Sequence, residues 1–233
     1  MLRRLALPLM WLAIWTQVAW GQVVFDAAAT GTAANAASLT FAHTVGAGGT
    51  NRVLIVGVSI DNRTVTGVTY AGVAMTSVGS VANGAQISHL WRLVNPATGA
   101  NDVAITLSGG GTDIVGCAIS VTGAHQTSPV GTFASATGTS TAVTVNVTSA
   151  ADELVVDMAS VDAGALTVGA GQDSRCNATA GDNQGGGSTE AGAGTVTMSW
   201  TSTVSSAWAT GGVSVKVAAA GASRLRMMQG MGR

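Results

Sequence analysis

Residues 195–200 read Thr-Val-Thr-Met-Ser-Trp, a segment in which polar and apolar side chains alternate at every position. A period of two places successive side chains on opposite faces of a β-strand, so we expect one face of this segment to be buried and the other hydrated. The same alternation recurs at residues 102–107, 143–147 and 213–217. It is typical of antiparallel sheets that pack as a sandwich.

Two further segments are apolar on both faces. Residues 53–58 read Val-Leu-Ile-Val-Gly-Val, and residues 154–158 read Leu-Val-Val-Asp-Met. Because neither face of such a strand suits water, we predict that both segments lie at the centres of sheets. A loop or a neighbouring element should then cover the outer side of each sheet.

Clusters of Gly, Asn, Asp and Ser separate these segments and supply the backbone conformations that tight turns need. The sequence therefore predicts an all-β fold, an antiparallel β-sandwich or jelly roll of about ten to twelve strands. No stretch has a helical period long enough to compete with that interpretation. Residues 173–192 are polar and rich in Gly, and we interpret them as a long loop that is either mobile or faces a ligand.

The N-terminus has the order of a secretory signal peptide, which predicts export to the cell surface or the medium of a bacterial-type cell. Arg3 and Arg4 precede an uncharged apolar stretch over residues 5–18, and small residues suited to signal peptidase follow. The stretch is shorter than the roughly 20 residues that span a bilayer, which disfavours the alternative of an uncleaved anchor. We expect residues 1–21 to be removed, residues 22–217 to form one β-sandwich domain, and residues 218–233 to form a flexible basic tail.

The charge balance excludes a nucleic-acid partner. The chain has 10 Lys and Arg against 11 Asp and Glu. Loss of Arg3 and Arg4 would leave eight basic against eleven acidic residues, a net charge of −3, without the basic surface that phosphate binding needs. No segment after residue 21 has the apolar length of a membrane span.

Cys117 and Cys176 are the two cysteines of the chain. Cys117 is in phase with Val115 and Ile119 on an apolar strand face, whereas Cys176 lies in a loop-like stretch. Export would allow a disulfide between them, and a buried free thiol is the alternative. Only the distance between the two residues decides between these interpretations.

Several motifs resemble a family of secreted bacterial β-sandwich (jelly-roll, lectin-like) surface-protein modules of uncharacterised function. The motifs lie at residues 43–59, 68–73, 90–96, 154–157, 167–172 and 198–209, so the resemblance spans about residues 38–217. It implies a place at the cell surface beside adhesive modules, and it brings no catalytic residues. Two positions depart from the family pattern: Ala71 stands where a second Gly is usual in a turn, and Cys176 stands where a larger residue is common.

The chain contains no nucleophile elbow, no His-Glu-x-x-His zinc motif and no phosphate-binding loop. Asp61, Asp157 and Asp162 lie at or near the ends of the two apolar strands, so neighbouring strands would let their oxygens gather around Ca²⁺. The same carboxylates could in principle form a glycosidase pair. Sugar binding would need exposed aromatic rings, and the candidates are Tyr70, Trp91, Trp200 and Trp208. Tyr70 precedes a turn and is the one we expect to be exposed, whereas at least three of the four should lie in the core; Trp200, for example, is in phase with Val196 and Met198.

These observations favour a non-catalytic extracellular or cell-surface module for structure or adhesion, which holds a polymer, a glycan or other surface proteins and needs no cofactor. The alternative is a Ca²⁺-dependent carbohydrate-binding domain, and a polysaccharide hydrolase ranks below it. Edge strands poor in lysine also suggest self-association, in which residues 22–25 complete a neighbour's sheet.

Overall fold

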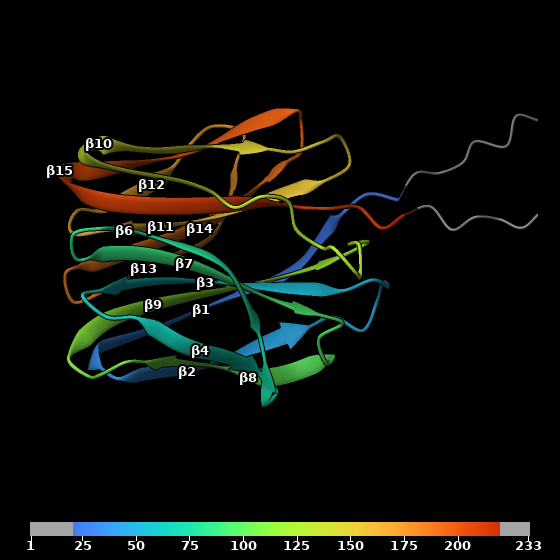
Figure 1. The fold of residues 1–233 in the computed structure, drawn as a ribbon, viewed down its shortest axis with the longest axis horizontal. Helices are drawn as coiled ribbons and strands as arrows, with labels where there is room; N and C mark the ends of the chain where they lie inside the picture. The colour runs from blue at the N-terminus through green and yellow to red at the C-terminus, as the bar shows by residue number, and fades with distance from the viewer. Residues whose placement is uncertain (1–20, 220–233) are drawn as a thin grey trace, which may run out of the picture.

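The computed structural model describes residues 21–219, which form fifteen strands with antiparallel pairing throughout and no helix (Figure 1). The predicted all-β antiparallel sandwich is confirmed. The predicted count of ten to twelve strands is too low. The predicted signal peptide, apart from Gly21, and the predicted tail beyond residue 219 lie outside the described residues.

The strands form three sheets. The central sheet has the order β1 (Val24–Ala36), β9 (Thr112–Thr122), β3 (Val53–Asp61), β7 (Gln86–Val94), β6 (Thr76–Asn83). The small sheet has the order β2 (Ser38–Val45), β8 (Gly99–Leu107), β4 (Val65–Tyr70), β5 (Val73–Ala74). The large sheet has the order β10 (Ala134–Thr148), β15 (Thr195–Val215), β11 (Leu154–Val161), β14 (Asn183–Ala191), β13 (Asp173–Ala180), and β12 (Leu166–Val168) also pairs with β15.

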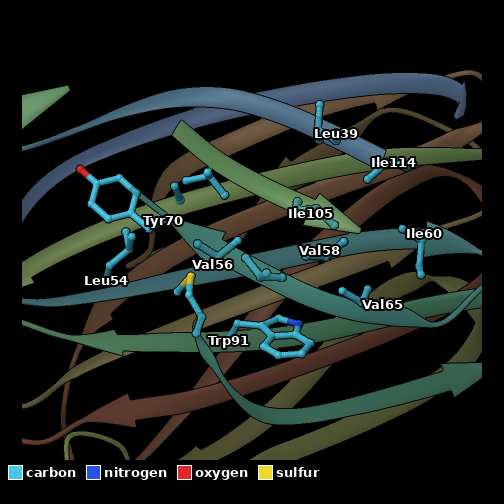
Figure 2. Close-up of a cluster of buried hydrophobic side chains, with 14 of the residues drawn as sticks. Leu39, Leu54, Val56, Val58, Ile60, Val65, Tyr70, Trp91, Ile105 and Ile114 are labelled. Atoms are coloured by element: carbon cyan, nitrogen blue, oxygen red, sulfur yellow. The ribbon is translucent and has the colours of Figure 1, made fainter. Parts of the chain in front are cut away.

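Strands β3 and β9 of the central sheet are buried on both faces, because this sheet lies between the other two sheets (Figure 1). Val56 and Val58 of β3 pack toward the small sheet, in a cluster that contains Ile105 (Figure 2). Val53 and Ile55, on the opposite face of the same strand, join a cluster with side chains of the large sheet. This placement explains why residues 53–58 are apolar on both faces, and it confirms their predicted place inside a sheet.

Strand β15 is 21 residues long. Its C-terminal part pairs with β11, and its N-terminal part lies over one face of β11, so the large sheet is folded back on itself. Its pairing with β10 shifts register where Ser140 pairs with Ser206 and Ala142 pairs with Thr201. Residues 142–148 of β10, residues 195–202 of β15 and strand β12 together form what we call the outer layer. Val143 and Trp200 of this layer pack with side chains of β11, so β11 is also covered on both faces.

The prediction of a loop over residues 173–192 is wrong. Strands β13 and β14 form a hairpin there, and residues 183–189 are buried. Glycine explains the failure, because it contributes no side chain to an apolar pattern but allows layers to approach closely. A Cβ atom at Gly185 would lie 2.7 Å from Val115, and one at Gly186 would lie 3.1 Å from the Trp200 ring, so β14 is pressed between two layers.

A disulfide joins Cys117 of β9 to Cys176 of β13, with a distance of 5.8 Å between the two Cα atoms. Both residues are buried, and Cys176 lies in a strand rather than in a loop-like stretch. The bond therefore connects the central sheet to the large sheet across the core that the two share.

Candidate functional site

Polar groups gather where β3 leaves the core, around Asp61. Gln86 of β7 donates a hydrogen bond from Nε2 to Asp61 Oδ1, and Thr112 of β9 donates one to the carbonyl oxygen of Asp61. The pKa of Asp61 is raised to about 6, mainly by burial; the hydrogen bond from Gln86 opposes this rise, and the nearby negative charge of Asp162 adds to it. Asp61 is thus a half-buried carboxyl group that keeps its proton to a higher pH than an exposed aspartate does.

Three further carboxylates act on Asp61 at this end of the sheets. Asp162, Asp113 and Asp182 each raise its pKa through their negative charge. The Asp113 carboxylate accepts a 2.9 Å hydrogen bond from the backbone N–H of Asn35. The region is therefore rich in negative charge that local backbone donors partly balance.

Two open hollows meet at Asn62, the residue after β3. One hollow, of about 270 Å³, is lined by Asn35, Asp61, Asn62, Gly111, Thr112 and Asp113. The other, of about 490 Å³, is lined by Asn62, Arg63, Thr64, Gly84, Ile87, Ser108 and Gly109. Their linings are mostly polar, which suits contact with a hydroxylated ligand more than with an apolar one.

A buried network of hydrogen bonds reaches Asp61 through Gln86 and links the central sheet to the large sheet. Ser59 Oγ of β3 lies 2.8 Å from Ser160 Oγ of β11 and 2.8 Å from Asn183 Oδ1 of β14. Ser160 Oγ donates to Gln86 Oε1 at 2.9 Å, which orients the amide that in turn donates to Asp61. The network therefore fixes the Asp61 carboxylate relative to both sheets.

The structure does not bring together the three carboxylates predicted for Ca²⁺. Asp162 acts on Asp61 through its charge, but Asp157 projects from the other face of β11, away from Ser160 and the central sheet. Asp157 is only 1% exposed and accepts hydrogen bonds from Ser188 N at 2.8 Å, Ser188 Oγ at 2.7 Å and Trp200 Nε1 at 2.8 Å. Within residues 21–219, no group of three or more His, Cys, Asp or Glu side chains is arranged to hold a metal ion.

The four aromatic residues considered for sugar stacking are all buried. Tyr70 is 0% exposed, with its hydroxyl oxygen 3.1 Å from the carbonyl oxygen of Gly99, so the exposure considered for it is not found. It is in phase with Val68 on the inward face of β4, and the turn begins only after it. Trp91 is 8% exposed and packs in the same cluster (Figure 2). Neither ring offers a face to a ligand at the surface.

Sequence reasoning missed Ser59, Gln86, Ser160 and Asn183. Their one signal was a polar residue in phase with an apolar face, as for Ser59 after Val53, Ile55 and Gly57. That pattern identifies a buried hydroxyl group but not its partner, because the partners lie 101 and 124 residues further along the chain.

Comparison of the chain with protein-family models, curated proteins and solved structures gives no match. The resemblance to secreted bacterial surface modules therefore stays an expectation from the sequence motifs. In the part of the chain that the structure describes, no helix has the length and apolar character required to cross a membrane.

Proposed function

We propose that the chain is an exported, non-catalytic module that gives structure or adhesion at a cell surface by holding a polymer or other surface proteins. The observation that carries this proposal is the disulfide between Cys117 and Cys176, which connects the central and large sheets. Structural disulfides persist mainly in oxidising compartments, so the bond supports a location outside the cytosol. The signal-peptide pattern predicted for residues 1–21 favours the same location.

The interior of the molecule also supports a structural role. The Asp157 carboxylate accepts three hydrogen bonds from Ser188 and Trp200, and thereby ties β14 and β15 to β11. Ser59, Ser160 and Asn183 connect two sheets in a similar way. These polar groups form hydrogen bonds between layers. Such bonds resist mechanical and thermal separation of the layers, because breaking them leaves buried polar groups unpaired.

A Ca²⁺-dependent carbohydrate-binding domain is the second candidate. It is favoured by the carboxylates that act on Asp61 beside the polar hollows at Asn62. Hydroxylated ligands and hard cations both prefer oxygen atoms, which this end of the molecule provides. Asp61 and Asp162 are the residues that would serve it, and Asp157 has no part in it.

Thermal unfolding tests the two candidates against each other. The midpoint is measured with Ca²⁺, with a chelator and then with a panel of soluble polysaccharides, because any ligand of the folded state raises it by mass action. A structural module keeps the same midpoint with Ca²⁺ and with chelator. A rise that needs both Ca²⁺ and a glycan, and that Asp61→Asn abolishes while the exposed control Asp102→Asn retains it, would replace the structural proposal with the carbohydrate-binding one.

A further inference from the structure

The strands at the edges of the three sheets differ in how they are protected. An exposed edge strand offers unpaired backbone N–H and C=O groups to any other strand, so proteins shorten it, cover it or place charges on it. Strand β5 has two residues. Strand β13 has an ion pair of 2.8 Å between Arg175 and Asp173, and it packs against β1, which also packs against β2. Strand β6 packs against β10 and β15.

Strand β10 lacks these protections over half of its length. It is 15 residues long and contains neither a charged residue nor proline. Its first half is partly covered, because Asn83 of β6 donates a hydrogen bond of 2.7 Å to the carbonyl oxygen of Gly138. Residues 142–148 pair with β15 on one side, and no strand of residues 21–219 pairs with them on the other.

We propose that residues 142–148 of β10 pair antiparallel with the same segment of a second copy of the chain, about a two-fold axis. A two-fold interface places a segment against itself, so any charged side chain near the axis meets its own like charge. An uncharged segment avoids that repulsion and suits its own copy. The inference rests on the proposed structural role and names the partner, a second molecule of the same kind.

The side chains of this segment are arranged for such a pairing. Val143, Val145 and Val147 point into the core of the outer layer and stay there when a strand is added. Thr144, Asn146 and Thr148 are exposed on the other face, where they would form cross-strand pairs with their counterparts. Asn146 already accepts a 2.7 Å hydrogen bond from Thr197 of β15, which shows that the face supports polar pairs between strands.

Residues 22–25 are the segment that the sequence suggested for completing a neighbour's sheet. In the structure this segment forms hydrogen bonds and strand pairs within its own chain. Val24 pairs with Thr122 and Phe25 with Val121, both of β9. The backbone N–H of Val23 donates a hydrogen bond of 2.9 Å to the carbonyl oxygen of Asp152. Strand addition at β10 needs none of these bonds to break.

Sedimentation of the purified chain over a wide concentration range tests the proposal, in buffer without any polysaccharide so that its outcome is independent of the ligand test. We expect a reversible rise from monomer to dimer mass. Thr144→Lys should raise the dissociation constant at least about tenfold, because like charges then face each other at the new strand pair. Thr197→Lys places the same charge on the same face one strand further from the edge, and should leave the constant within about twofold.

Single cysteine substitutions define the register independently. In an antiparallel pair of identical strands, only residues near the two-fold axis face their own copies closely enough for a disulfide. One position among Ala142→Cys, Thr144→Cys, Asn146→Cys and Thr148→Cys should cross-link far more rapidly than the others, and Thr197→Cys should not. A chain that stays monomeric at all concentrations, or a dimer whose cross-linking does not depend on position in β10, would overturn the proposal.

Discussion

Trp200 of β15 donates a hydrogen bond of 2.8 Å from Nε1 to Oδ2 of Asp157 on β11. Both side chains are 1% exposed, so the bond is buried between β11 and the outer layer of the large sheet. The carboxylate also accepts two hydrogen bonds from Ser188 of β14. One buried acid therefore holds three strands of the folded-over sheet together.

Asp157 should make the stability of the protein depend on pH. Burial raises its pKa to about 6 from 3.8, so the folded protein holds this proton more tightly than the unfolded chain. The free energy of unfolding should then fall as pH rises from about 4 to about 6, by on the order of 3 kcal/mol for this group alone. In Asp157→Asn this contribution disappears. Urea unfolding of both proteins at pH 4 and pH 7 checks it: a difference between them that is the same at both pH values contradicts the account.

His89 should have the opposite effect. It is buried beside Trp91, with Nε2 2.8 Å from Ser77 Oγ, and burial lowers its pKa to about 4 from 6.5. Between about pH 4 and pH 6.5, His89 is therefore neutral in the folded protein but protonated in the unfolded chain. Its contribution to stability is complete above pH 6.5 and is lost as pH falls toward 4. In His89→Gln this loss on acidification should be absent, and a slope equal to that of the parent protein between pH 6.5 and pH 4 would show that burial of His89 is not its cause.

Removal of the disulfide should destabilise the protein strongly. Cys117 and Cys176 are 59 positions apart, and cross-linking a loop of that size restricts the unfolded chain by about 4 kcal/mol in the chain-entropy model. The double variant Cys117→Ala with Cys176→Ala should lose stability on that order in denaturant unfolding. A reducing agent should lower the stability of the parent protein but not that of the variant, and equal responses of the two would contradict the assigned pairing.

Gly185 should not tolerate a side chain. A Cβ atom there would lie 2.7 Å from Cβ and Cγ1 of Val115 in the central sheet, close to the backbone of that strand and unable to move away easily. Gly185→Ala should cost about 1–3 kcal/mol of unfolding free energy through overpacking. Gly67→Ala is the matched control in a strand, because no atom lies within 4 Å of its Cβ position. Equal stability of the two variants would mean that the layers are less tightly packed than they appear at β14.

The sequence predicts the fold wherever side chains report their surroundings. Residues 53–58 are apolar on both faces, and β3 indeed lies inside a sheet covered on both sides. The same reasoning fails at β14, because Gly185, Gly186 and Gly187 are buried without an apolar side chain to show it. The fold of β15 over β11 depends on a register shift opposite Ser140, and periodicity cannot locate such a shift.

The candidate site was predictable only in part. Asp61 is the last residue of β3 and Asp162 directly follows β11, so both lie at strand ends, as the sequence predicts, and Asp162 is near enough to raise the pKa of Asp61. Asp157 lies inside a strand, and its position relative to Ser160 puts it on the opposite face, toward Trp200. The hydrogen bonds around Ser59 join residues far apart in the chain, so they follow from the packing of sheets rather than from any local motif.

The central claim is that the chain is a structural module outside the cytosol with an internal disulfide. The mass and the cellular location of the protein test this claim most directly. The chain is expressed with its own N-terminus in a bacterial host, the cell fractions are separated, and the unreduced protein is examined by mass spectrometry with peptide mapping. We predict a protein outside the cytosol that begins at Gln22 and has Cys117 bonded to Cys176. A full-length chain that stays in the cytosol with both thiols free would contradict the account.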